Sequence, residues 1–128
     1  MKKNKFILFF LFLAAISFGQ KQNVDSTSNV KLNAKKQIEK YRARVIKGES
    51  MASLAILYSE DPGSAGEGGI YYNVARGVMD PKFESVAFSL KQGQISQVFE
   101  TAYGFHFIQL VKIHGKLLDL RHILIIPK

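Results

Sequence analysis

Apolar positions in the first half of the chain recur with the period of an α-helix. After Leu32 they are spaced four, three and four residues apart, at Ala34, Ile38, Tyr41 and Val45. This spacing places them on one face of a helix, which Gly48 is suited to end. A second helix is expected from Ser50 to Tyr58. Its inward positions would be Met51, Leu54, Ala55 and Tyr58.

Residues 60–69 interrupt the helical pattern. This stretch contains four glycines and one proline, so it predicts a loop. Further on, Asp80 and Pro81 place a capping carboxylate before a proline at the first helical position, which predicts a third, short helix. Its apolar side would consist of Phe83, Val86, Ala87 and Leu90. Gly93 is expected to end it.

The rest of the chain has the composition of β-strands. Three segments, 95–101, 105–113 and 117–126, are rich in β-branched, aromatic and aliphatic residues. Because the helices precede the strands along the chain, the predicted fold class is α+β.

Two histidines could meet through a hairpin between the last two of these segments. If residues 113–115 form a three-residue loop with Gly115 in the left-handed conformation, His106 and His122 lie opposite or diagonal on one sheet face. A two-residue turn at His114 and Gly115 would shift the register by one residue and move His122 to the other face. The residues alone leave both turns open.

The first nineteen residues have the pattern of a secretory signal peptide. Three lysines among the first five residues precede an apolar run over 6–16, and Ser17 and Gly19 suit the positions before a cleavage site. This run is shorter than the roughly 20 residues that span a bilayer, although a retained N-terminal anchor is an alternative. We therefore expect residues 1–19 to be removed, 20–30 to form a flexible lead-in, and 31–128 to form one periplasmic or secreted domain.

Composition and missing motifs narrow the possible chemistry. The absence of cysteine excludes disulfides, thiolate zinc sites and a cysteine nucleophile. The formal net charge is +8, but no run of five or more basic residues occurs, and nucleic acid is not expected as a partner of an exported chain. The sequence lacks a phosphate-binding loop, a Gly-x-Ser-x-Gly elbow and a His-Glu-x-x-His motif. The three histidines lie eight residues apart, a spacing that matches no local metal motif, so neither a metal nor a cofactor is expected.

An ordered series of motifs resembles the parvulin family of peptidyl-prolyl cis/trans isomerases. The series consists of residues 52–55, 58–65, 68–69, 76–84, 87–90, 93–96 and 101–106. It reads Ala-Ser-Leu-Ala, Tyr-Ser-Glu-Asp-Pro-Gly-Ser-Ala, Gly-Gly, Arg-Gly-Val-Met-Asp-Pro-Lys-Phe-Glu, Ala-Phe-Ser-Leu, Gly-Gln-Ile-Ser and Thr-Ala-Tyr-Gly-Phe-His. The resemblance covers roughly residues 35–113. It implies the FKBP-like superfold, in which helices surround a four-stranded antiparallel sheet.

One family motif stands at the other end of this chain. The opening strand of the family carries Arg-His-Ile-Leu and lies beside the last strand. Here Arg121-His122-Ile123-Leu124 follows that last strand instead. The resemblance therefore predicts a circularly permuted sheet whose first strand is supplied by residues 121–128. The alternative is that these residues begin a second, truncated parvulin domain.

The resemblance implies an active site on one face of the sheet. His106 and His122 match the two histidines of the family. Thr101 matches the threonine near them, and Asp61 stands where some parvulins carry Cys and others Asp. In this reading Asp61 would tune the electrostatics beside the histidines, without acting as a nucleophile.

The substrate-binding residues follow from the same resemblance. Met79 and Phe83 match the apolar floor of the proline pocket, although plain core packing is an alternative for both. Tyr71 stands where Leu is usual, and the residues Ile70-Tyr71-Tyr72 depart from the family pattern after Gly68-Gly69.

The implied function is prolyl isomerisation that assists the folding of exported or outer-membrane proteins. Its partners would be proline-containing unfolded or nascent exported polypeptides, with no stable membrane insertion after signal cleavage. The chain would act as a monomer or as a strand-exchanged dimer. The alternative is a non-catalytic periplasmic chaperone or peptide-binding module on the same scaffold.

Overall fold

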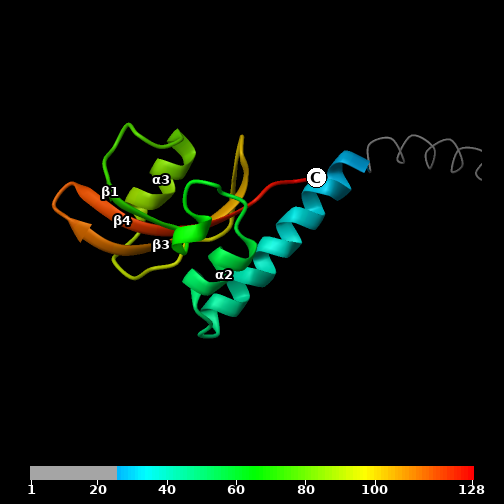
Figure 1. The fold of residues 1–128 in the computed structure, drawn as a ribbon. Helices are drawn as coiled ribbons and strands as arrows, with labels where there is room; N and C mark the ends of the chain where they lie inside the picture. The colour runs from blue at the N-terminus through cyan, green and yellow to red at the C-terminus, as the bar shows by residue number, and fades with distance from the viewer. Residues whose placement is uncertain (1–25) are drawn as a thin grey trace, which may run out of the picture. The chain divides into compact units, whose positions relative to one another are not determined.

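The computed structural model describes residues 26–128 (Figure 1). The predicted signal peptide and residues 20–25 lie outside the described residues. Residues 33–128 form one compact unit. Helical structure is present from residue 26, so the lead-in predicted over 20–30 extends too far. Within residues 26–128, no helix combines the length and the apolar character needed to cross a bilayer.

The first two predicted helices are present. The first spans residues 26–46, and Gly48 follows it with a φ of 111°. Helix α2 (Met51–Tyr58) begins after Ser50, whose hydroxyl oxygen accepts a hydrogen bond from the backbone N–H of Ser53 at 3.1 Å. This side chain satisfies an amide that has no partner within the helix, which explains why the helix begins here.

The third predicted helix is also capped as its sequence indicates. Helix α3 (Pro81–Ser89) begins after Asp80, and one carboxylate oxygen of Asp80 accepts from Lys82 N at 2.8 Å and Phe83 N at 3.1 Å. The helix ends at Ser89, earlier than the predicted stop at Gly93.

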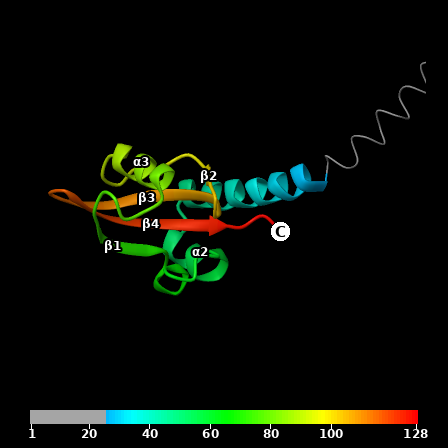
Figure 2. The ribbon, with the colours of Figure 1, turned by 90° about the horizontal axis from the view of Figure 1, so that it is seen from above.

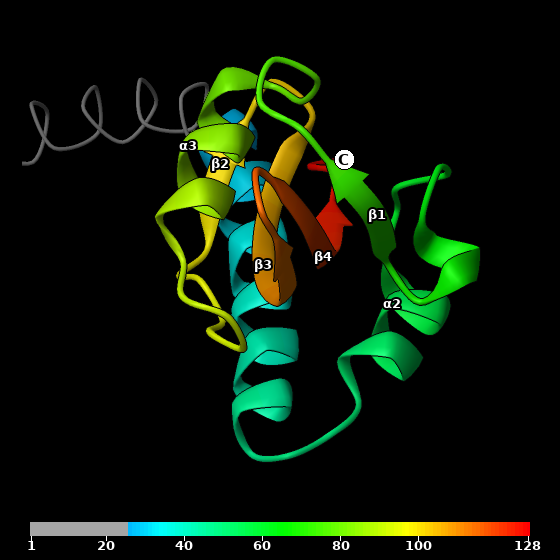
Figure 3. The ribbon, with the colours of Figure 1, turned by 90° about the vertical axis from the view of Figure 1, so that its left-hand side faces the viewer.

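Four strands form one antiparallel sheet. They are β1 (Ile70–Val74), β2 (Phe99–Thr101), β3 (Gly104–His114) and β4 (Leu117–Ile125). The strand order is β1-β4-β3-β2, so the C-terminal strand lies in the middle of the sheet (Figure 2, Figure 3). This confirms that the C-terminal residues supply the strand that the parvulin pattern places first. Strand β1 was not predicted, and of segment 95–101 only β2 is a strand, apart from an isolated bridge between Ile95 and Gln109.

The two faces of the sheet are covered by different helices. On one face, the first helix and α2 pack through their apolar residues against Phe105, Phe107, Ile123 and Ile125. On the other face, Phe83 and Ala87 of α3 pack with Val74 and with residues of β3 and β4, namely Ile108, Leu110, Leu118 and Leu120. Figure 1 shows α2 and α3 on opposite sides of the sheet. Strands β3 and β4 therefore contribute to both cores.

The glycine-rich loop over residues 60–69 runs beside β4. It contains one short 3-10 helix, η1 (Ala65–Glu67). The carbonyl oxygen of Gly69 accepts a hydrogen bond from His122 N at 2.9 Å, and a Cβ atom at Gly69 would lie 2.3 Å from the His122 carbonyl oxygen. Gly69 also has a φ of 79°. Only glycine allows this close approach of the loop to the strand.

The hairpin between β3 and β4 differs from both predicted turns. Its turn consists of Gly115 and Lys116, with Gly115 at a φ of 58°. A glycine with positive φ at the first central position is what a type II′ turn requires. The pairing then shifts by one residue between Leu110 and Lys112, which leaves Val111 as the extra residue of a β-bulge.

The bulge decides which face His122 occupies. Beyond it His122 pairs with Ile108 and His106 pairs with Leu124, so the two histidines lie diagonally on one face. The direct pairing of His106 with His122 is therefore wrong, whereas the diagonal arrangement is confirmed. Without the bulge, the pairing set by the turn would continue along both strands and would pair His106 with Ile125. The two histidines would then lie on opposite faces of the sheet.

Deleting Val111 should therefore destroy the native pairing. The deletion removes the extra residue of the bulge and with it the one-residue shift in pairing. The apolar side chains of β4 must then face the wrong side of the sheet, or the turn must form at a different place. We expect loss of the cooperative thermal transition followed by circular dichroism. Val111→Ala keeps the residue count at a 39% exposed position and should change the free energy of unfolding by less than about 0.5 kcal/mol. A deletion variant with the stability of the wild type would contradict this account of the bulge.

Candidate functional site

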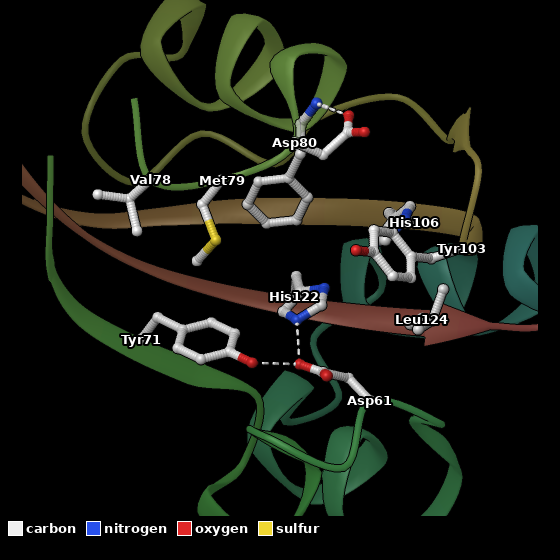
Figure 4. A pocket seen from close by; sticks show the side chains of 10 residues that line it. Asp61, Tyr71, Val78, Met79, Asp80, Tyr103, His106, His122 and Leu124 are labelled. Atoms are coloured by element: carbon white, nitrogen blue, oxygen red, sulfur yellow. Dashed lines mark hydrogen bonds and ion pairs between the residues drawn. The ribbon is translucent and has the colours of Figure 1, made fainter. Parts of the chain in front are cut away.

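A pocket of about 310 Å³ opens on the sheet face that α3 covers (Figure 4). Its polar lining consists of Asp61, Asp80, His106 and His122. Its apolar and aromatic lining consists of Tyr71, Val78, Met79, Phe83, Tyr103 and Leu124. Six of the seven predicted site residues thus line one pocket. The seventh, Thr101, contacts it through His106.

Two histidines form the buried centre of the site. His106 on β3 and His122 on β4 are each 4% exposed. Their rings stack with centroids 5.7 Å apart and an interplanar angle of 23°. The Phe83 ring packs edge-to-face against both imidazole rings, with centroid distances of 5.5 Å to His106 and 5.1 Å to His122. Phe83 is therefore both part of a hydrophobic core and part of the pocket wall.

Asp61 receives several hydrogen bonds on one carboxylate oxygen. Its Oδ2 lies 2.8 Å from His122 Nε2 and accepts from the Ser64 hydroxyl at 2.6 Å and the Tyr71 hydroxyl at 2.7 Å. The hydrogen bond from His122 holds the pKa of the Asp61 carboxyl well below its ordinary value of 3.8, and those from Ser64 and Tyr71 add to this effect against the cost of burial. Asp61 is therefore a fixed anion at neutral pH.

His106 has a different environment. Its Nε2 lies 2.7 Å from the hydroxyl oxygen of Thr101, which also accepts a hydrogen bond from Tyr103 N at 3.1 Å. Burial, with a contribution from His122, lowers the pKa of His106 from 6.5 to about 4. This ring is therefore neutral at pH 7.

The hydrogen-bond partner of His122 fixes the position of its ring proton. A carboxylate can only accept, so His122 carries a proton on Nε2, which faces Asp61. The Thr101 hydroxyl oxygen accepts from Tyr103 N and keeps a second lone pair and its proton, so it suits either tautomer of His106 at Nε2. Within the described part of the chain, the buried Nδ1 atom of each ring has no hydrogen-bond partner.

Some features of the site were not foreseen in the sequence. Ser64, which bonds both Asp61 and His122, was not predicted as a site residue, although its position three residues after Asp61 in a tight loop is a usable signal. Tyr71 was expected only as a pocket residue, yet its hydroxyl also contacts Asp61. The third histidine, His114, lies at the hairpin end and bonds Asp119 at 2.6 Å. Among residues 26–128 no group of three or more metal-ligating side chains is gathered.

Comparison with known proteins identifies relatives of this chain. A model of the family described as "Rotamase: PPIC-type PPIASE domain" matches residues 16–112. The chain is 40% identical over 83 residues to the foldase protein PrsA of Geobacillus sp. (strain WCH70), covering 65% of this chain and 30% of that protein. It is 38% identical over 78 residues to the chaperone SurA of Alkalilimnicola ehrlichii, covering 61% and 18%.

A solved structure has a similar fold. The crystal structure of the peptidylprolyl isomerase PrsA from Bacillus cereus matches with a TM-score of 0.60 and 34% identity, over 64% of this chain and 32% of that one. The chain thus spans about a third or less of the length of these relatives. The family match stops at residue 112, so β4 lies beyond it.

The stability of the fold should depend on pH through His106. Between about pH 6.5 and pH 4 the unfolded chain binds a proton at this residue and the folded chain does not, so stability falls as the pH drops through this range. The full effect is about 3 kcal/mol. Urea unfolding at several pH values measures it, and His106→Gln should reduce the slope. Asp61 acts at lower pH, because its stabilising contribution is lost only below about 3.8. A slope that His106→Gln leaves unchanged would contradict the assignment.

Proposed function

The chain belongs to the PPIC-type peptidyl-prolyl isomerase family, and from that premise we propose that its pocket catalyses the cis/trans isomerisation of X-Pro bonds. One observation carries the proposal for this chain. An apolar pocket large enough for a proline ring ends on two buried histidines and a fixed carboxylate. All three polar groups come from parts of the chain that only the folded sheet brings together.

The reaction suits a site that has no activated nucleophile. Rotation about an X-Pro bond has a barrier of about 18–20 kcal/mol and breaks no covalent bond. Catalysis therefore requires a better fit to the twisted amide than to the planar one. Met79, Phe83 and Leu124 supply apolar walls that hold the proline ring and exclude water from its carbonyl. Removal of water favours the twisted amide, which is less polar than the planar one.

Asp61 contributes through its charge. Its Oδ2 is occupied by three donors, so the carboxylate is not positioned to attack the substrate. The planar amide carries partial negative charge on its carbonyl oxygen, and twisting reduces that charge. A fixed anion near this oxygen therefore disfavours the planar form more than the twisted form. This role requires neither a metal nor a cofactor.

The remaining polar residues orient the site. Thr101 holds His106, and Asp61 with Ser64 holds His122, so neither ring needs to reorganise during the reaction. A neutral His106 presents a dipole to the substrate without adding a positive charge that would offset Asp61. We assign His106, His122, Asp61 and Thr101 to the catalytic set, and Met79, Phe83 and Tyr71 to substrate binding.

The proposed clients are unfolded or nascent exported polypeptides that contain proline. Two of the similar proteins bear the names foldase and chaperone, which supports a role in protein folding. The charged start and apolar run of residues 1–19 support export to the periplasm or to the outside of the cell. The pairing of β4 with β1 and β3 is the same in a monomer and in a strand-exchanged dimer, and both remain part of the proposal.

Exchange spectroscopy by NMR on an X-Pro peptide tests the proposed activity. The protein should accelerate cis/trans exchange, and Met79→Ala should lower kcat/KM about tenfold because the proline ring loses an apolar contact. Turnover indistinguishable from that of the uncatalysed peptide would exclude the isomerase. Peptide binding without turnover would instead favour a non-catalytic peptide-binding module.

Met51 offers a matched control for the pocket methionine. Met51→Ala removes a buried methionine of α2, which belongs to the core on the opposite face of the sheet. It should lower the free energy of unfolding by about 2–5 kcal/mol and leave kcat/KM of the folded protein unchanged. Equal losses of kcat/KM in both variants would mean that Met79 acts only through stability.

A further inference from the structure

Tyr71 on β1 contacts both members of the Asp61 and His122 pair. Its hydroxyl donates to Asp61 Oδ2 at 2.7 Å, and its ring stacks on the His122 ring at 5.6 Å between centroids and 27° between planes. Figure 4 shows the phenol and the imidazole approaching the carboxylate from different strands. Asp61 is therefore bonded to one side chain of β1 and one of β4.

The loop leaves space for the Tyr71 hydroxyl in particular. A Cβ atom at Gly63 would lie 2.6 Å from the Tyr71 hydroxyl oxygen, which is closer than real Cβ contacts. The next atoms are the ring carbon that bears the hydroxyl, at 3.6 Å, and Asp61 Oδ1, at 3.7 Å, both at ordinary contact distance. The side chain missing from Gly63 thus makes room for one oxygen atom.

The backbone around Tyr71 is held in place independently. Tyr71 pairs with Leu120 of β4, and the β1–β4 register becomes irregular directly after it. There Asn73 adopts a φ of 56°, and its N–H donates to Asp119 Oδ1 at 2.9 Å. A buried side chain of β4 therefore fixes the end of β1, which anchors Tyr71 beside the strand that carries His122.

The local hydrogen bonds of Asp61 come from its own loop, where its Oδ1 accepts from Gly63 N at 3.3 Å and its backbone carbonyl oxygen accepts from Ala65 N at 2.9 Å. Asp61 belongs to the glycine-rich loop, and Ser64, one of its donors, belongs to the same loop. Among residues 26–128, the hydrogen bonds that join its carboxylate to side chains of the sheet come from Tyr71 and His122. Loss of the Tyr71 hydroxyl would leave His122 as the one strand residue, among those described, that bonds the carboxylate, and the carboxylate would gain freedom to move with its loop.

We propose that Tyr71 is a positioning residue that holds the Asp61 carboxylate against His122. Its hydroxyl acts on Asp61, and its ring supports the imidazole that the carboxylate orients. The effect of Tyr71 on turnover rests on the proposed isomerase function, whereas its effect on Asp61 does not.

The direct test follows the Asp61 carboxyl carbon by NMR while the pH is lowered. Tyr71→Phe keeps the ring and removes only the hydroxyl, so Asp61 should protonate at a higher pH than in the wild type, because its carboxylate has lost one donor. Tyr72→Phe is the matched control, since the neighbouring Tyr72 is 68% exposed and does not line the pocket. Its Asp61 titration should match that of the wild type.

Gly63→Ala tests the same contact from the other side. The added methyl group should push the Tyr71 hydroxyl off Asp61 and raise the pH of protonation as Tyr71→Phe does. In the double variant Gly63→Ala/Tyr71→Phe the methyl meets only atoms at ordinary contact distance. The double variant should therefore behave like Tyr71→Phe alone. A further upward shift in the double variant would show that Gly63 acts on Asp61 by another route and would overturn the argument from space.

Turnover provides the second measurement. For the X-Pro peptide, Tyr71→Phe should lower kcat about tenfold with little change in KM, the loss expected from one hydrogen bond to a charged group. Loss of thermal stability with an unchanged Asp61 titration and unchanged kcat would overturn the proposal and leave Tyr71 a packing residue. A wild type without turnover, combined with a shifted titration in Tyr71→Phe, would remove the isomerase function but retain the positioning role.

Discussion

Strand β4 must be hydrogen-bonded along both edges and buried on both faces, and the sheet and its two cores depend on this constraint. It pairs with β1 on one side and with β3 on the other. Its residues Leu118 and Leu120 enter the core under α3, while Ile123 and Ile125 enter the core under the first helix and α2. A sheet lacking this strand would have two unpaired edges and two incomplete cores. Within residues 33–128, β4 therefore pairs with two strands and contributes to both hydrophobic cores.

The candidate site is built on this same strand. His122 lies between residues that enter the two cores, and it is itself buried. Phe83 packs with both histidines and also belongs to the core under α3. Because core residues and pocket residues coincide, the shape of the pocket is set by the packing that holds the fold together. The packed core therefore holds the pocket side chains in place, and no further helix or strand is needed to do so.

Local signals in the sequence predicted more of this structure than long-range contacts did. Ser50 and Asp80 indicated where α2 and α3 begin, because a capping side chain acts on the amides next to it. Strand β1 escaped prediction because it is short and follows a glycine-rich loop, and because its end is fixed by Asp119, a residue distant in sequence. The pattern of β4 could show that both faces are apolar, but it could not supply the pairing register.

For the candidate site, too, the sequence predicted some features and missed those that depend on long-range contacts. The parvulin resemblance brought His106, His122, Asp61 and the pocket residues together, since it carries the family's spatial arrangement with it. The register between β3 and β4 was a separate question. Compared with the predicted three-residue loop, the turn at Gly115 and Lys116 shifts the pairing by three residues, and the bulge at Val111 shifts it back by one. Both shifts are odd, so they cancel for the face on which His122 lies. No local pattern states whether such a pair of changes occurs, because the outcome depends on cross-strand packing.

The place of β4 at residues 117–125 has a consequence for the order in which this protein is made. Ribosomes extend a chain from its N-terminus. In the usual parvulin order the central strand emerges first and its neighbours add to it. Here β1, β2 and β3 emerge without a partner between β1 and β3, and they must wait for β4. The pocket therefore cannot form before β4 has emerged, because His122 and Leu124 of β4 belong to its lining.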